Sequence, residues 1–261
     1  MPESMLLLAI DTCGPTGSVA LGRWDGQAVE ILGQIELEGR SYSSTLVAAV
    51  SEVLALGGVT LQEVGAIVAV SGPGSFTGVR VSLAAVKGLA EAARIPVIAV
   101  SRLEVLAAKA GVESAALDAH RHEVYLRINE EDRVPQVRGP HGQVFVRGVE
   151  IPILGSGKPY LSTGQFFMEM LAGAHELAAI DPAPARIAIC DDAAALLLCA
   201  AWPDAELIRT AAPTAADALQ LCAPRVAAGE FVDLALLDGH YLRRSDAEIF
   251  GEPAATEQQR P

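Results

Sequence analysis

The stretch that decides the fold is residues 64–104, VGAIVAVSGPGSFTGVRVSLAAVKGLAEAARIPVIAVSRLE. Residues 65–70 form a short, uncharged, apolar run, which predicts a strand buried on both faces. The next segment, 71–78, holds three glycines, which permit a tight turn and close backbone approach. A helix is expected over 78–93, with Ser75 or Thr77 as its N-cap. A second buried strand follows at 97–100, so the stretch predicts a strand–helix–strand unit.

The residues before this stretch predict a hairpin-led sheet. Apolar runs at 5–12, 18–24 and 29–37 each predict a strand, and Asp25-Gly26 is a strong hairpin turn signal between the second and third. A helix is expected over 45–56. The predicted order is three strands, a helix, and then two strand–helix repeats, which is typical of an α/β protein.

A similar opening recurs in the second half of the chain. Residues 114–118 end in Asp118 as residues 7–11 end in Asp11, and expected strands at 123–129 and 143–149 follow. We therefore predict two domains of related topology, an N-terminal domain over 1–112 and a C-terminal domain over 113–250. Residues 251–261 are polar and are expected to form a disordered tail.

Composition narrows the function classes. The 261 residues are 51% hydrophobic and 20% charged, with a net charge of −13, which argues against this chain holding nucleic acid without a partner. No apolar run reaches the length of about 18 residues that a membrane span needs, and no secretory leader is evident, so a cytoplasmic protein is expected. The four cysteines have no metal-ligand spacing and are expected to be reduced thiols.

The glycine loop leaves two interpretations open. Lying between a strand and a helix, it could hold an anion, which makes Asp11, Gly72, Gly74, Ser75 and Gly78 a candidate nucleotide site. The loop lacks the lysine of a Walker motif, and the alternative is a strained turn that lets the helix pack closely. Asp11 and Asp118 are each placed to bind a metal–phosphate group or to cap a strand end. No catalytic set and no metal site is predicted.

Two helices carry more apolar surface than one core requires. On the helix over 78–93, the charged residues fall within about 60° of one another at 100° per residue. One hypothesis is a partner interface built from two apolar ridges, and the alternative is that both ridges face the chain's own sheet. The ridge residues are Leu46, Val50 and Val53 on the first helix and Val79, Leu83, Val86 and Ala90 on the second.

Several words of the sequence resemble the TsaB (YeaZ) family. They are LAIDT at 8–12, GSVAL at 17–21, SGPGSFTGVR at 71–80, PVIAVS at 96–101, ALDA at 116–119 and HYLR at 240–243. The resemblance is densest over residues 5–126. It implies the two-domain actin/sugar-kinase/Hsp70-like ATPase (RNase H-like) fold. It also implies a non-catalytic subunit of the bacterial machinery that transfers threonylcarbamoyl to N6 of the tRNA adenosine following the anticodon.

The catalytic paralogue in that machinery, TsaD, binds metal through histidines in a segment that matches residues 101–106 here. Arg102 and Leu106 stand at the histidine positions, and Tyr42 lies near another, so the resemblance implies that this chain binds no metal. Neither a protonated guanidinium nor an aliphatic side chain has a lone pair to offer. No cofactor is expected to be required, and ATP or ADP binding is expected to be weak.

Two functions are weighed. The first is a partner subunit that binds and stabilises a TsaD-like paralogue, with a TsaE-like ATPase as a further partner, contact with tRNA only through the complex, and a homodimer as one state of the isolated chain. The second is an independent ATP-dependent phosphotransferase or peptidase of the same fold. Neither hypothesis involves a membrane.

Overall fold

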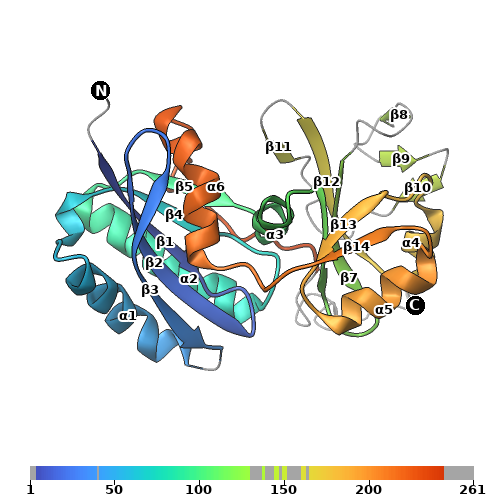
Figure 1. Cartoon of the computed structure of the whole chain (residues 1–261), viewed down its shortest axis with the longest axis horizontal. Coiled ribbons are helices and arrows are strands. Elements are labelled where there is room, and N and C mark those ends of the chain that lie inside the picture. Colours follow the sequence, from blue (N-terminus) through green and yellow to red (C-terminus); the bar gives the residue numbers. More distant parts are fainter. Residues whose placement is uncertain are drawn as a thin grey trace, which may run out of the picture.

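The protein forms two lobes, each built on a β-sheet, with one short helix between them (Figure 1). The computed structural model describes residues 4–39, 41–129 and 165–243, together with the strand backbones at 137–138, 144–146, 149–151 and 160–162. The expected tail over 251–261 lies outside the described residues. In the described part of the chain, no helix is long and apolar enough to cross a membrane.

The sheet of the first lobe has five strands in the order β3-β2-β1-β4-β5. Its hairpin pairs are antiparallel, and β1 pairs in parallel with β4, as β4 does with β5. Residues 7–11 and 66–70 are buried without interruption, because helices cover both faces of these central strands. The predicted hairpin-led sheet is confirmed. Its strands are β1 (Met5–Asp11), β2 (Thr16–Trp24), β3 (Val29–Glu38), β4 (Val64–Val70) and β5 (Val97–Val100).

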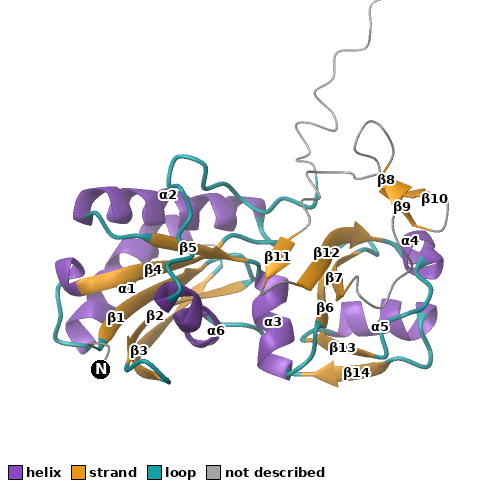
Figure 2. Cartoon of the chain, turned by 90° about the horizontal axis from the view of Figure 1, so that it is seen from above, coloured by secondary structure: helices purple, strands orange, loops and turns teal. Residues whose placement is uncertain are grey.

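Three helices cover this sheet. Helices α1 (Tyr42–Leu56) and α2 (Phe76–Ala93) lie side by side, and a short 3₁₀ turn, η1 (Leu61–Glu63), precedes β4. Helix α6 (Ala215–Ala227) comes from far along the chain and packs against β1 and β2 from the other face, which Figure 2 shows with α2 and α6 on opposite sides. Ser18 Oγ accepts the amide of Ala215 at 2.8 Å, and this bond ties the start of α6 to β2.

The sheet of the second lobe repeats the first topology with an added edge strand, in the order β11-β12-β7-β6-β13-β14. An antiparallel hairpin is again followed by parallel strands, as the recurrence of strand-end aspartates predicted. Helices α4 (Ala174–Ala179) and α5 (Asp192–Ala201) complete this lobe, and α3 (Arg102–Ala110) lies between the lobes. The strands are β6 (Ser114–Asp118), β7 (Val124–Asn129), β11 (Tyr160–Ser162), β12 (Gln165–Ala172), β13 (Arg186–Ile189) and β14 (Glu206–Arg209).

The prediction that residues 143–149 form the third strand of the second main sheet is wrong. That position in the sheet is taken by β12, which pairs with β7 along its length from Phe167 to Ala172. Residues 144–146 form β9, which pairs with β8 (Val137–Arg138) and β10 (Val149–Ile151) in a separate small sheet. Both segments are apolar, so the local pattern alone did not distinguish the strand that joins the main sheet.

The two apolar ridges face the chain's own core, so the hypothesis that they form a partner interface is wrong. Every ridge residue is at most 5% exposed and belongs to the apolar cluster of the first sheet. Helical periodicity identified each ridge but not the direction in which it points. Ala84 and Gly88, two small residues that made the rest of α2 resemble a second apolar face, lie on its exposed side. The seven buried residues are Leu46, Val50, Val53, Val79, Leu83, Val86 and Ala90.

The division into domains at residues 112 and 113 stays a prediction. Strands β6 and β7 begin the second sheet directly after that point. Helix α6, however, lies within the stretch 113–250 and packs on the first sheet. A division of the chain into two units by packing would therefore assign α6 to the first of them.

Candidate functional site

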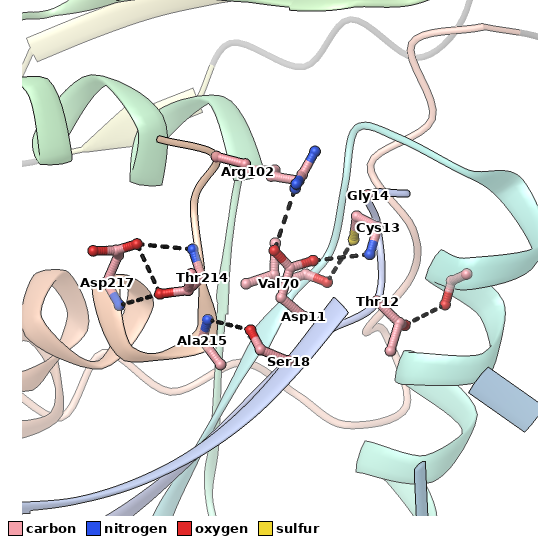
Figure 3. Close-up of polar contacts among 12 residues, drawn as sticks. Asp11, Thr12, Cys13, Gly14, Ser18, Val70, Arg102, Thr214, Ala215 and Asp217 are labelled. Carbon is pink, nitrogen blue, oxygen red and sulfur yellow. Dashed lines mark hydrogen bonds and ion pairs between the residues drawn. The ribbon is translucent and has the colours of Figure 1, made fainter. Parts of the chain in front are cut away.

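The candidate site lies where β1, β4 and β5 end, at one edge of the first sheet. Asp11 is the last residue of β1 and its side chain is 2% exposed. Its Oδ1 accepts the backbone amide of Cys13 at 2.8 Å, a local turn that fixes the carboxylate (Figure 3). Its Oδ2 accepts Nε–H of Arg102 at 3.2 Å. Both oxygens of the strand-end carboxylate therefore have donors from this chain.

Arg102 is placed by the two elements that meet at it. It is the first residue of α3, directly after β5, and its backbone amide donates to the carbonyl of Gly72 at 2.6 Å. Its side chain is 6% exposed and lies so close to Gly14 that a Cβ there would overlap the guanidinium. Burial lowers the pKa of Arg102, but the charges of Asp11, Cys13 and Cys190 and the hydrogen bond to Asp11 together outweigh burial and hold the pKa above its usual value. The guanidinium is a fixed positive charge on the Asp11 carboxylate.

Two further polar side chains near Asp11, those of Cys13 and Tyr42, are also hydrogen-bonded within this chain. Burial, followed by the charge of Asp11, raises the pKa of the Cys13 thiol, and Cys13 Sγ donates to the carbonyl of Val70 at 3.3 Å. Burial and then Asp11 raise the pKa of Tyr42 to about 12, and its hydroxyl donates to the carbonyl of Gly14 at 2.8 Å. Both groups are neutral hydrogen-bond donors near neutral pH, and neither is an activated nucleophile.

The glycine loop packs against the end of β1. A Cβ on Gly74 would overlap the carbonyl oxygen of Cys13, and one on Gly78 would overlap that of Thr12. Thr12 Oγ1 donates to the carbonyl of Gly78 at 2.7 Å, and the amide of Ser75 donates to the carbonyl of Cys13 at 2.8 Å. These glycines therefore allow α2 to approach β1, which is the alternative that the sequence left open.

Two further features of the loop follow from its backbone. Gly72 and Gly74 have φ of 113° and 157°, which favours glycine at both positions. Ser75, the expected N-cap, accepts the amide of Gly78 on its side chain at 3.2 Å. The structure therefore brings together all five predicted site residues, Asp11, Gly72, Gly74, Ser75 and Gly78, at one sheet edge. The loop contacts above join them to other parts of the chain.

Asp118, the corresponding residue of the second sheet, holds a turn. Its Oδ1 accepts the amide of His120 at 2.7 Å, and its Oδ2 lies 2.9 Å from His120 Nδ1. The backbone amide of Asp118 donates to Asp191, the N-cap of α5, at 3.0 Å. The strand-capping interpretation accounts for these contacts.

The pairing of Arg102 with Asp11 was not predicted from the sequence. Arg102 was expected only to be unable to bind metal, with no partner assigned. The sequence did contain a signal for this pairing. Asp11 ends β1 and Arg102 closely follows β5, and these two parallel strands are separated in the sheet by β4 alone. The carboxyl ends of parallel strands meet at the same edge of a sheet, which brings residues distant in sequence together.

Two sheets of matching hairpin-led topology, each with an aspartate at the end of its first strand, define the actin/sugar-kinase/Hsp70-like class of α/β protein. Residues 32–136 match the family model described as TsaD, tRNA N6-adenosine threonylcarbamoyltransferase. A solved structure of an uncharacterized protein from Pseudomonas aeruginosa with similarity to peptidase YeaZ covers 92% of this chain and 100% of its own, with a TM-score of 0.63 and 27% identity.

Two curated relatives carry the name tRNA threonylcarbamoyladenosine biosynthesis protein TsaB. The Haemophilus influenzae protein is 36% identical over 149 residues, 55% of this chain and 60% of its own length. The Escherichia coli protein is 37% identical over 134 residues, 49% of this chain and 56% of its own length. The aligned part of this chain thus spans less than two thirds of either relative. In sequence and in fold the chain is similar to proteins of the TsaB (YeaZ) family.

Proposed function

We propose that this chain is a non-catalytic subunit of the machinery that transfers threonylcarbamoyl to N6 of a tRNA adenosine. Its role is to bind and stabilise a catalytic TsaD-like paralogue, with a TsaE-like ATPase as a further partner. The names of the relatives support the pathway, and the match of residues 32–136 to the TsaD model supports descent from a common ancestor. The net charge of −13 favours contact with tRNA through the complex.

The buried pair of Asp11 and Arg102 is the observation that carries the non-catalytic role. In this fold a strand-end carboxylate is suited to hold a metal–phosphate group. Here that carboxylate is neutralised by a guanidinium at 3.2 Å and bonded to the Cys13 amide. A metal ion would have to displace the buried guanidinium of Arg102, which would leave that guanidinium as a buried charge without its partner.

The outer faces of α1 and α2 are the surface that we propose for the paralogue. The corrected orientation of these helices leaves Val47 67% exposed on α1, next to Ala48, with Ala84 and Gly88 exposed on α2. Adjacent helices with small outward side chains let a second pair of helices approach closely and pack ridges into grooves. A related chain with the same two helices offers such a pair.

The proposal is tested with the purified chain and its TsaD-like paralogue. Val47→Glu should abolish co-elution on size exclusion and the stimulation of threonylcarbamoyl transfer to tRNA. Leu196→Glu is the matched control, because Leu196 is a 74% exposed helix residue on α5 of the second lobe, and it should change neither readout. Co-elution that survives Val47→Glu, Ala84→Glu and their combination contradicts the proposed surface. Full transfer activity of the paralogue without this chain contradicts the proposed role.

The alternative function, an independent enzyme, is tested by assaying the purified chain without its partners. ATP hydrolysis or peptidase activity that is present in the parent chain and lost in Asp11→Asn would assign the chain to the enzyme class. We expect no turnover above that of the Asp11→Asn variant, because the carboxylate already has two donors from this chain.

A further inference from the structure

Residues 237–243, here called the strap, run from the first lobe to the second. Leu237 is buried in the apolar cluster of the first sheet, and Leu242 is buried with Leu103 and Leu117 in the cluster around α3. The strap therefore joins two separate apolar cores within a few residues. Helix α6 precedes the strap in the chain, and Arg243 at the end of the strap contacts the hairpin turn between β6 and β7.

The strap binds the first lobe at the glycine loop. The amide of His240 donates to the carbonyl of Ser71 at 2.7 Å, directly before Gly72. The ring of Tyr241 contacts the ring of Phe76, the first residue of α2, with centroids 4.8 Å apart. A Cβ on Gly72 would lie 3.1 Å from the carbonyl oxygen of His240, so the strap lies against the loop itself.

The strap binds the second lobe through a buried carboxylate. His240 Nε2 lies 2.8 Å from Oε2 of Glu169, a residue of β12 whose side chain is fully buried. Ser101 Oγ donates to the same oxygen at 2.6 Å, and Arg127 on β7 donates to Oε1 at 2.8 Å. The Glu169 carboxylate on β12 therefore contacts the strap, the N-cap of α3 and the neighbouring strand β7.

The end of the strap holds a turn with an unusual backbone. His120, Arg121 and His122 have φ of 61°, 56° and 61°, three successive non-glycine residues in the left-handed region. Such residues persist where the surrounding structure fixes them. Arg243 donates to the carbonyl of Ala119 at 2.7 Å and pairs with Glu123, so it binds the turn on both sides.

We propose that the strap is a clasp that fixes the orientation of the two lobes relative to each other, with Glu169 as its buried joint. Hinge motion between two domains is a general way for a protein to open and close around a ligand, and it requires few contacts across the hinge. Here His240 contacts both lobes at once, through its backbone and its side chain. Release of the strap is expected to permit a lobe motion that the intact chain lacks.

The distance between the lobes measures this directly. Glu52→Cys on α1 and the native Cys199 on α5 are both exposed and can carry spin labels in a Cys190→Ser background. Cys13 and Cys222 are buried, and burial raises the pKa of Cys222 to about 12, so both stay unlabelled. Double electron–electron resonance should give one narrow distribution of the distance between the two spin labels in the parent. His240→Ala and Arg243→Gln should each give a broader distribution with a second population.

Arg209→Gln is the matched control, because Arg209 pairs with Asp192 at 2.8 Å within the second lobe. It should leave the distance distribution unchanged. Unchanged distributions in both strap variants overturn the proposal. So does broadening in Arg209→Gln equal to that in the strap variants, since the effect would then be unspecific.

Hydrogen exchange on Arg243→Gln decides the matter if His240→Ala fails to fold. The amide of His240 bonds to Ser71 on the first lobe, three residues from the substituted side chain. A clasp that opens as a unit predicts exchange at His240 roughly tenfold faster than in the parent, which corresponds to about 1.4 kcal/mol. Faster exchange confined to Ala119 and Glu123 in the turn would show a local contact only and would overturn the clasp.

Discussion

Arg102 Nε lies 3.2 Å from Asp11 Oδ2, although 91 residues separate the two in sequence and both side chains are buried. The pair joins the end of β1 to the start of α3, and so links the first sheet to the helix between the lobes. Asp11 is the carboxylate of the nucleotide site that the sequence left open. In the folded chain the Asp11 carboxylate forms an internal ion pair with Arg102.

The pair predicts a non-additive effect on stability. Arg102→Leu leaves Asp11 as a buried charge without its cation and should cost about 3 kcal/mol or more of unfolding free energy. Adding Asp11→Asn removes that charge, so the double variant should be less destabilised than the sum of the single variants. Urea unfolding of the four proteins measures the coupling. Strictly additive costs would mean that the two side chains do not interact.

Two glycines of α2 should respond in opposite directions to alanine. Gly78→Ala would place a Cβ on the carbonyl oxygen of Thr12, a backbone atom that cannot move without shifting β1, so we expect a loss of several kcal/mol. Gly88 has open space around its Cα, and Gly88→Ala should stabilise the chain by about 0.5–1 kcal/mol through helix propensity. Thermal unfolding compares them, and equal effects of the two substitutions would contradict the close packing of the loop.

Charge substitutions on the two sides of a helix test the corrected orientation of α1 and α2. Leu83 is 5% exposed and faces the sheet, so Leu83→Glu should destabilise the chain by roughly 4 kcal/mol or prevent folding. Val47 is 67% exposed, and Val47→Glu should stay within about 0.5 kcal/mol of the parent. Circular dichroism with thermal denaturation is sufficient. A soluble, stable Leu83→Glu protein would restore the ridges as an external surface.

The buried carboxylate of Glu169 predicts a loss of stability in acid. Burial raises its pKa, but the hydrogen bond from His240 and the charges of His240 and Arg127 outweigh burial, and the pKa lies below its usual 4.5. A depressed folded-state pKa contributes stability above about pH 4.5, and this contribution is lost as the pH falls through the folded-state value. Glu169→Gln should therefore be less stable than the parent at pH 7, and the difference in unfolding free energy should narrow only below about pH 4.5.

Urea midpoints between pH 3 and pH 7 measure this gap. Glu206→Gln is the control, because its partner Arg186 and Glu206 itself are more than half exposed, and the pair should contribute little at any pH. A gap between the parent and Glu169→Gln that stays constant across the range would contradict the assigned ion pairs.

Local sequence determined the elements and much of their order. Apolar runs without charge marked β1, β4 and β5, Asp25-Gly26 marked the first hairpin, and the repeated strand ending in aspartate indicated a second sheet of related topology. Ser75 was one of two candidate caps for α2, because a serine side chain can accept an amide three residues away, as it does here from Gly78. These features depend on contacts within a few residues, and a sequence displays them directly.

The tertiary structure decided everything that depends on direction and on distant partners. Period alone could not say that Leu83 faces the sheet while Ala84 faces outward, because both sides of α2 are apolar. Nor could it place α6 on the first sheet, choose β12 over residues 143–149, or pair Arg102 with Asp11 and His240 with Glu169. Each of these contacts joins segments far apart in the chain, and only the packing of the complete core selects among the alternatives that the local pattern permits.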